Sequence, residues 1–236
     1  MTVSELNVHG VRVPICVGEV SPEIWDALKS GRYEANEARR VHRAIQPGDH
    51  VLELGAGLGV ITSIIAAVEG VRVWSFEADP RTAMLAQRVI DRNCGDNVVF
   101  TNGLLAAGPA RRVSFYQRAD FWMSSRFAEQ GPYEQVIEIA SRDIDSFIRT
   151  HGINVVVMDI EGAELELLQH ALLPGIERVF LEFHDHLYGL AGVRAISETM
   201  SRKGLIYDPR GSSGPCVLYS VDDGERHFDE VIAHAS

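Results

Sequence analysis

Short apolar runs of strand length alternate with amphipathic stretches of helix length along most of the chain, and this alternation limits the possible folds more than any other feature. The runs are rich in valine and other apolar residues, which is typical of strands buried on both faces of a parallel sheet. The strands are expected at residues 51–54, 71–76, 98–101, 153–158 and 179–183. The helices are expected at residues 58–69, 80–93, 161–171 and 189–203. The pattern predicts a doubly wound α/β fold.

Weaker patterns surround this core. Two helices are expected at residues 22–29 and 34–45, before a stop at Pro47 and Gly48. Further short strands are expected at residues 113–117, 136–140, 205–207 and 216–221, of which the last two are expected to form a C-terminal antiparallel hairpin. No linker or repeat divides the chain. We therefore expect one domain over residues 1–236, with a helical cap at 1–47 and a Rossmann-like core at 48–236.

Charge argues against nucleic acid and membranes as partners. The 236 residues include 33 acidic side chains against 22 lysines and arginines, a formal net charge of −11, whereas nucleic acid binding needs clustered basic residues. The longest uncharged stretch is too short to span a bilayer, and residues 1–10 lack the order of a signal peptide. Cys16, Cys94 and Cys216 are expected to be free thiols. We expect a cytoplasmic protein with a small-molecule partner; pairing of two copies through the N-terminal helices is left open.

The segment VLELGAGLGVIT, residues 51–62, connects an expected strand to an expected helix through Gly55, Gly57 and Gly59. Glycines permit a tight turn and let a ligand approach the backbone. A dinucleotide-binding loop has the spacing G-x-G-x-x-G, which brings a pyrophosphate onto the helix N-terminus. Here the spacing is G-x-G-x-G, and Glu53 stands two residues before the first glycine. An acidic side chain at this place favours a ligand with an ammonium group over a pyrophosphate.

A second acidic residue, Glu77, follows the next expected strand in the sequence FEADP. At the carboxyl end of that strand a carboxylate can accept hydrogen bonds from both hydroxyls of a ribose. S-adenosylmethionine carries a ribose, an ammonium and a sulfonium but no phosphate, so the two acids and the glycines predict it as the cofactor. The structural alternatives are that Glu53 complements a helix dipole and that Glu77 caps the helix beginning at Pro80.

A third motif, VVVMDIEGAELELLQHA, covers residues 155–171 and runs from a buried strand into a helix. Gly162 permits a sharp turn, so Asp159 and Glu161 are expected at the carboxyl end of the strand, beside the cofactor. For Glu164 we expect only a favourable interaction with the helix N-terminus.

These motifs resemble the FkbM family of S-adenosylmethionine-dependent methyltransferases, class I Rossmann-like enzymes of which many methylate hydroxyl groups of sugars or natural products. The resemblance rests on GRYEANEARRV, VLELGAGLGVIT, FEADP, RDIDSF and MDIEGAELELL, the last being the most specific. It implies a seven-stranded, mostly parallel sheet with an antiparallel C-terminal hairpin. The chain departs mildly from the family, with Glu53 where many relatives have Asp, Leu58 where many have Asn or Ile, and Ala78 where Pro is common.

The resemblance also implies which residues form the site. The cofactor-binding residues are expected to be Tyr33, Glu34, Glu53, Gly55, Ala56, Gly57, Gly59, Glu77, Ala78, Gly103, Leu104 and Asp159. Among these, Tyr33 and Glu34 lie in the segment that can close over the cofactor in such enzymes, and Gly103 and Leu104 follow the third strand, near the adenine. The acceptor is expected to contact Ser124, Ser125 and Glu182.

Methyl transfer to a hydroxyl requires alignment of the acceptor and removal of its proton. His184, in the sequence LEFHDHLYG, follows the fifth expected strand and titrates near neutrality, so it is the expected base, with Asp159 and Glu161 completing the catalytic set. A positioning or structural role for His184 is the alternative. Asp159, Glu161, Glu182 and His184 could also bind Mg²⁺ or Mn²⁺, but no local ligand spacing supports this, and no metal is expected.

The function expected from the sequence is O-methylation of a small polar metabolite, sugar or natural product. One alternative is N- or carboxyl-methylation of an amino acid or peptide, and another is a non-catalytic partner subunit that binds S-adenosylmethionine. The glycine spacing disfavours an NAD-dependent oxidoreductase. The identity of the acceptor is not predicted.

Overall fold

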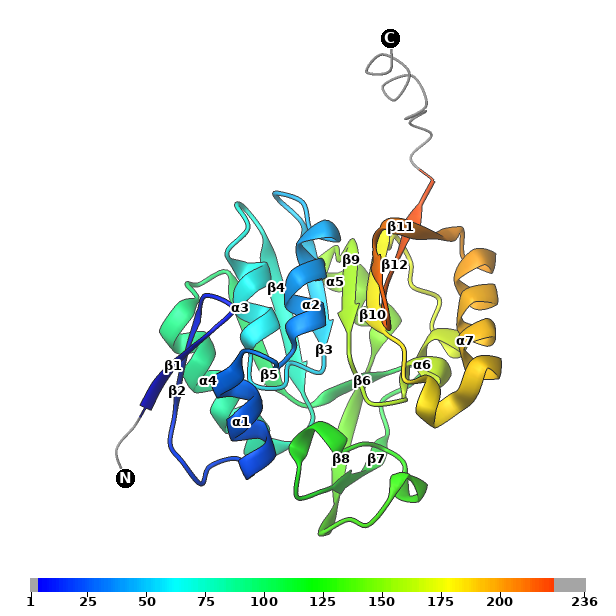
Figure 1. Cartoon of the computed structure of the whole chain (residues 1–236). Coiled ribbons are helices and arrows are strands. Elements are labelled where there is room, and N and C mark those ends of the chain that lie inside the picture. Colours follow the sequence, from blue (N-terminus) through cyan, green and yellow to red (C-terminus); the bar gives the residue numbers. More distant parts are fainter. Residues whose placement is uncertain (1–3, 223–236) are drawn as a thin grey trace.

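A seven-stranded sheet forms the centre of the computed structural model, which describes residues 4–222 (Figure 1). The strand order is β11-β12-β10-β9-β3-β4-β5. The bounds are β3 His50–Leu54, β4 Arg72–Glu77, β5 Val98–Asn102, β9 Val155–Met158, β10 Arg178–Glu182, β11 Leu205–Ser213 and β12 Cys216–Val221. The five strands from β10 to β5 are parallel to their neighbours, whereas β12 is antiparallel to both β10 and β11. The expected fold class, including its C-terminal hairpin, is confirmed.

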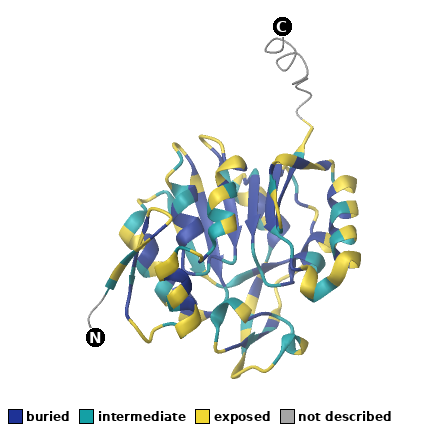
Figure 2. Ribbon diagram, in the orientation of Figure 1, coloured by how far each residue is buried: buried dark blue, intermediate teal, exposed yellow. Residues whose placement is uncertain are grey.

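Helices cover both faces of this sheet, because the side chains on both faces of its central strands are mostly apolar and buried. The helices α5 (Ile144–His151), α6 (Glu164–His170) and α7 (Asp185–Arg202) pack on one face, and α2 (Ala35–Arg40), η1 (Val41–Arg43) and α3 (Val60–Ala66) pack on the other. Successive residues of one strand point to opposite faces of the sheet. Leu52 packs with the first group of helices, and Val51 packs with the second group. The buried strands lie between helices whose outer surfaces are exposed (Figure 2).

The N-terminal region differs from the all-helical cap expected for residues 1–47. It begins with a β-hairpin of β1 (Ser4–Val8) and β2 (Val11–Ile15), followed by α1 (Pro22–Ser30). The hairpin turns at His9 and Gly10, both of which have positive φ. Its alternate apolar residues are buried against α1 and α4 (Pro80–Asn93). In the sequence, apolar residues occupy every second position from 11 to 15, and this pattern indicates a strand.

A second, three-stranded sheet lies at the carboxyl ends of the main strands, below them in Figure 1. Its order is β6 (Leu104–Ala106), β8 (Gln135–Asp143) and β7 (Arg112–Gln117). Between β7 and β8, a loop containing the short helices η2 (Phe121–Met123) and η3 (Ala128–Gln130) returns toward the main sheet. Arg118 is buried inside this loop, and its guanidinium donates to the carbonyls of Met123 and Phe127. The arginine therefore fixes the conformation of a loop that has little regular structure.

A buried ion pair ties the opposite end of the main sheet together. Arg178 on β10 donates to both carboxylate oxygens of Asp49, at 2.8 and 2.9 Å, and to the carbonyl of Ala44 at 2.9 Å. Asp49 also accepts from the backbone N–H of Gln46 and the side chain of Asn154. These bonds satisfy both charges, which burial would otherwise make costly.

The three cysteines are free thiols in the structure, as expected. Across residues 4–222, no helix combines the length and the apolar character needed to cross a membrane.

Candidate active site

A cavity of about 500 Å³ lies at the carboxyl ends of β3, β4, β9 and β10. Parallel strands bring their carboxyl ends to one edge, so residues from distant parts of the chain meet there. The sequence-predicted residues that line the cavity are Tyr33, Glu34, Gly55, Gly57, Glu77, Ala78, Gly103, Leu104, Ser124, Asp159, Glu161, Glu182 and His184. The predicted residues that do not line it are Glu53, Ala56, Gly59 and Ser125.

The glycine loop after β3 presents bare backbone to the cavity. Gly55 and Gly57 have φ of 85° and 52°. A Cβ atom at Gly55 would lie 1.8 Å from the carbonyl oxygen of Asp159, and one at Gly57 would lie 2.7 Å from the hydroxyl of Tyr33. Neither position has room for a side chain, so the loop requires glycine on both steric and conformational grounds.

Ala56 and Gly59 shape this loop from behind and do not face the cavity. Ala56 is buried, and its carbonyl accepts from the N–H of Gly59 at 2.7 Å. Gly59 has φ of 79° and precedes α3, where an added Cβ would lie 3.1 Å from Ile90 of α4. These two residues were expected to contact the cofactor. In the structure, the turn that contains them packs closely against α4.

Glu77, at the end of β4, is buried and holds the glycine loop. Its carboxylate accepts from the N–H of Gly57 at 3.0 Å and from the N–H of Asp79 at 2.8 Å. Burial raises the pKa of Glu77 to about 8. Asp79, and not Glu77, caps α4, because its side chain accepts from the N–H of Arg81. The carboxylate of Glu77 therefore remains available to a ligand in the cavity.

Glu53 lies on the other side of the loop. One carboxylate oxygen accepts from the hydroxyls of Thr62 and Ser75, and the other has no partner. Burial raises the pKa of this group to about 7. Glu53 lines a much smaller cavity beneath Gly55, which it shares with Glu34, Asp159 and Glu182. Glu53 is thus adjacent to the main cavity without opening into it.

The segment before α2 covers one side of the cavity. The Tyr33 hydroxyl accepts from the N–H of Leu58 at 3.2 Å, and its ring stacks on Trp122, with 6.4 Å between centroids. Glu34 has a left-handed backbone with φ of 48°, and burial raises the pKa of its carboxyl group. Tyr33 and Glu34 thus lie beside the glycine loop and line the cavity; their closure over the cofactor stays a prediction.

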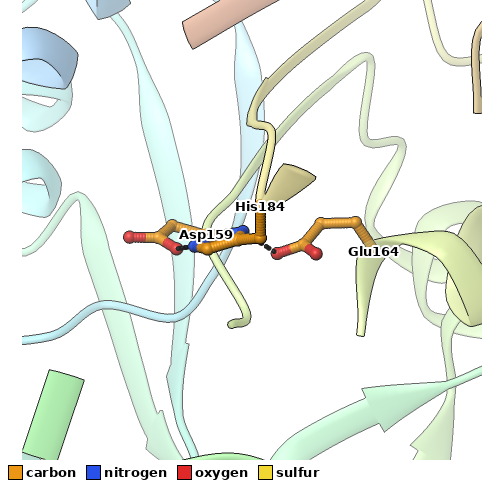
Figure 3. A group of neighbouring side chains, drawn as sticks. All are labelled: Asp159, Glu164 and His184. Atoms are coloured by element: carbon orange, nitrogen blue, oxygen red, sulfur yellow. Dashed lines mark ion pairs between the residues drawn. The ribbon is translucent and has the colours of Figure 1, made fainter. Parts of the chain in front are cut away.

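His184 lies between carboxylates at the end of β10 (Figure 3). Its Nε2 is 3.3 Å from Asp159 Oδ1 and 3.5 Å from Glu161 Oε2, and its Nδ1 is 3.3 Å from Glu164 Oε1. The backbone N–H of His184 donates to the hydroxyl of Tyr188 at 2.7 Å. The histidine comes from β10 and the three acids come from the segment after β9, so the pairing of neighbouring parallel strands brings these groups together.

The carboxylates determine the protonation of this histidine. Burial lowers the pKa of His184, but the nearby carboxylates of Asp159 and Glu164 raise it more strongly, to about 12. Burial and the charge of Asp159 also raise the pKa of Glu161 to about 9. The raised pKa of His184 favours an imidazolium at neutral pH in the ligand-free protein, and an imidazolium cannot accept a proton. The role of base expected from the sequence requires the neutral ring and stays a prediction.

The sequence did not predict the contact between Glu164 and His184. It accepts from the N–H of Ile160 at 2.8 Å, which agrees with the expected helix-terminal role, but it is also fully buried against the His184 ring. A signal was present, because Glu164 shares one helix face with the buried residues Leu167 and Leu168. An acid on an apolar face needs a buried partner.

The two serines predicted to contact the acceptor hold the β7–β8 loop. Ser124 accepts from the N–H of Arg118 at 2.9 Å, and Ser125 donates to Gln130 Oε1 at 2.5 Å. Ser124 reaches the cavity lining, whereas Ser125 is buried behind it. Ser125 therefore does not line the cavity of this structure, and the contact of the two serines with an acceptor stays a prediction.

The cavity is strongly acidic. Its lining includes the carboxylates Glu34, Glu37, Glu77, Asp159, Glu161 and Glu182. Against these stand two arginines, Arg32 and Arg126, the second of which pairs with Glu166 at 3.3 Å. A ligand with ammonium and sulfonium charges fits such a lining, whereas a pyrophosphate would be repelled. The bare backbone at Gly55 and Gly57 is also compatible with S-adenosylmethionine.

The family model of the methyltransferase FkbM domain matches residues 53–206, well over half of the chain. A ribosomal protein L11 methyltransferase of Chloroflexus aurantiacus is 30% identical over 93 residues, which cover 39% of this chain and 26% of that protein. Trm5b from Pyrococcus abyssi has a TM-score of 0.47 at 17% identity, with 93% of this chain and 54% of that chain covered. An O-methyltransferase from Bacillus cereus in complex with SAH has a TM-score of 0.45 at 15% identity, with 87% and 84% covered.

Proposed function

The chain belongs to the FkbM family of S-adenosylmethionine-dependent methyltransferases, and from this membership we propose that it methylates a hydroxyl group of a small polar acceptor. The observation that carries the proposal is the group of carboxylates, Asp159, Glu161 and Glu182, that faces the cavity beside the glycine loop. A hydroxyl must lose its proton as it is methylated, and a carboxylate at this position provides the acceptor for that proton.

The cofactor would be held by three segments that meet at the cavity. The Glu77 carboxylate would accept the ribose hydroxyls, the backbone of Gly55 and Gly57 would lie along the ligand, and Asp159 would attract its positive charge. When bound, S-adenosylmethionine supplies an electrophilic methyl group on a sulfonium, and the electron pair of the broken S–C bond stays on sulfur. The stacked rings of Tyr33 and Trp122 would exclude water from this part of the site.

Glu161 is the proton acceptor in this proposal. Its pKa of about 9 in the ligand-free protein makes its ionised form a stronger base than an ordinary carboxylate. The positive charge of a bound cofactor favours that ionised form. As the acceptor oxygen forms its bond to carbon, the O–H bond breaks and its proton passes to Glu161. The ring of His184, between Asp159 and Glu164, positions the two acids on its Nε2 side.

An amine acceptor is the second candidate, favoured by the excess of carboxylates in the cavity lining. These side chains would attract an ammonium group and could take up its proton before methylation. They would repel an acceptor carboxylate, so carboxyl-methylation is disfavoured.

The test combines product identification with one pair of variants. The protein is incubated with methyl-labelled S-adenosylmethionine and fractionated small-molecule extracts, and mass spectrometry locates the label in the product. We expect O-methylation, with a kcat that falls about 10²- to 10⁴-fold in Glu161→Gln while the affinity for the cofactor is retained. Glu198→Gln is the matched control, because Glu198 is exposed on α7 and pairs only with Arg194 on the protein surface. A product methylated on nitrogen, or full turnover in Glu161→Gln, would contradict the proposal.

A further inference from the structure

We propose that His184, Asp159 and Glu161 form a binding site for one divalent cation, of the Mn²⁺ or Mg²⁺ type, on the floor of the cavity. The role of this cation, binding the acceptor hydroxyl, rests on the proposed function, but its binding to the protein does not. The proposal reverses the expectation from the sequence, in which no local ligand spacing indicated a metal.

The distances in this group agree with coordination better than with direct ion pairing. Nε2 of His184 lies 3.3 Å from Asp159 Oδ1 and 3.5 Å from Glu161 Oε2. Hydrogen bonds between a charged donor and a carboxylate are usually about 2.7–2.9 Å long. Two neighbouring ligands of an octahedral ion, each about 2.1 Å from the metal, are about 3.0 Å apart. The Nε2 atom is thus separated from each of the two carboxylate oxygens by nearly the distance at which one cation would hold a pair of ligands.

An unpartnered buried atom provides a second, independent observation. Only 5% of His184 is exposed. Asp159 Oδ1, which lies 3.3 Å from Nε2 of this ring, is buried and has no hydrogen-bond partner. Buried polar atoms without partners are costly, so their presence on a ligand-binding surface indicates a missing ligand.

Glu164 acts behind the imidazole and not as a ligand. Ligand atoms of Asp159, Glu164 and His184 lie within 4.8 Å of one another. However, Glu164 approaches Nδ1, and Asp159 lies on the opposite side of the ring, near Nε2 (Figure 3). Glu161 also approaches Nε2, and one cation cannot bond to both ring nitrogens. A metal-bound histidine usually donates its other ring N–H to a carboxylate, which fixes the tautomer and the orientation of the ring. Glu164, fully buried and held by the N–H of Ile160, is placed for that role.

Backbone hydrogen bonds hold Asp159 and Glu161, the two proposed carboxylate ligands, in place. Glu161 has a left-handed backbone with φ of 52°, and its carbonyl accepts from the side chain of Gln130 at 3.0 Å. Asp159 follows β9 directly, and its N–H donates to the carbonyl of Leu54. One imidazole with carboxylates is a donor set for Mn²⁺ or Mg²⁺, since structural zinc sites use four Cys or His ligands. Glu182 lies in the same lining and would offer a further oxygen.

The competing occupant of this position is a proton, which would leave His184 as an imidazolium between the same carboxylates. A cation would displace that proton and allow Nε2 to coordinate it. An acceptor hydroxyl bound to the cation would have a lower pKa, and its proton would then pass more easily to the carboxylate oxygen of Glu161 that does not bind the cation.

The experiment measures metal binding without the cofactor. The full chain is treated with EDTA, desalted and titrated with Mn²⁺, and bound Mn²⁺ is counted by electron paramagnetic resonance. We expect one Mn²⁺ per chain, displaced by excess Mg²⁺, with affinity reduced at least tenfold in Asp159→Asn and Glu161→Gln and about 10- to 100-fold in Glu164→Gln. Circular dichroism verifies that each variant is folded, and Glu198→Gln, outside the cavity, should bind Mn²⁺ as the wild type does.

Failure of this proposal can be distinguished from failure of the proposed function. No stoichiometric Mn²⁺ binding, or binding that Asp159→Asn and Glu161→Gln leave unchanged, would overturn the cation site. If methyl transfer then continued at full rate in EDTA, a proton would occupy the position and the proposed function would stand. If Mn²⁺ bound as expected but no methylated product formed in any extract, the cation site would stand and the proposed reaction would fail.

Discussion

Replacing Glu164 by Gln tests the electrostatic organisation of the site at its most buried point. The Glu164 Oε1 atom accepts from the N–H of Ile160 and lies 3.3 Å from His184 Nδ1. A glutamine can place its amide oxygen at the same position and keep the bond to Ile160. The substitution therefore removes one negative charge beside the imidazole with little change in shape.

The size of the effect follows from that distance. Two unit charges 3.3 Å apart interact by about 5 kcal/mol at an effective dielectric constant of about 20. Since about 1.4 kcal/mol corresponds to one pKa unit, the loss of the Glu164 charge should lower the pKa of His184 by about 3 to 4 units. From about 12 in the wild type, the pKa of the metal-free variant should fall to about 8 to 9.

The measurement is an NMR titration of the histidine ring in EDTA-treated protein between about pH 6 and 10. The wild-type His184 ring should stay protonated throughout, whereas the ring in Glu164→Gln should lose its proton within that range. Glu198→Gln, which alters an exposed carboxylate of α7, should behave as the wild type. A wild-type ring that titrates near its ordinary value, or a variant that titrates as the wild type does, would refute the electrostatic argument.

Three further predictions concern the cofactor, the fold and pH. Glu77→Ala should raise the Kd for S-adenosylmethionine about 10- to 100-fold by calorimetry, because the hydrogen bonds of the two ribose hydroxyls to this side chain are lost; unchanged affinity would remove Glu77 from the cofactor site. Arg178→Met should lower the free energy of unfolding by about 3–5 kcal/mol in urea, because the buried charge of Asp49 is left unpaired; a loss below about 1 kcal/mol would show that the pair is dispensable. Burial raises the pKa of Glu53 to about 7 and that of Glu77 to about 8, so the folded state retains protons that the unfolded state releases near 4.5. Stability of the ligand-free protein should therefore fall as pH rises from about 5 to 8, and thermal melts with a flat or rising profile would contradict this sign.

The centre of the sheet was predictable because its parallel strands are short, mostly apolar runs whose length and β-branched content favour a strand over an amphipathic helix. The long helix α4 has the bounds expected, since Asp79 and Pro80 mark its start. Other elements were missed where the local signal was short or mixed. The three-residue strand β6 and the helix α5 had not been predicted. Helix α7 was expected to start at Gly189 but begins at Asp185, because a first helical segment precedes the kink at Gly189, where φ is 64° and ψ is 178°.

The positions of the site residues were easier to predict than their protonation states. The carboxyl ends of β3, β4, β9 and β10 had to meet at one edge, so Glu77, Asp159, Glu161 and His184 were expected near one another. Protonation could not be predicted in this way. It depends on distances of a few ångströms between His184 and acids on a different strand–helix connection, and sequence spacing does not define such distances. The same limit explains why the position of Glu164 behind the ring was missed.

The β7–β8 loop lines one side of the cavity through Trp122, Met123 and Ser124, and it also contacts Glu161. Gln130, in that loop, holds the carbonyl of Glu161 and accepts from Ser125, while a Cβ at Gly162 would lie 3.0 Å from Gln130 Nε2. Glu161 has a backbone conformation that is unfavourable for a non-glycine residue and therefore depends on such contacts. A change in the loop that reshapes the acceptor side of the cavity would also release Glu161 and alter its distance to His184. Acceptor recognition and proton transfer should consequently change together when this loop is altered, whereas cofactor affinity, which depends on Glu77 and the glycine loop, should change little.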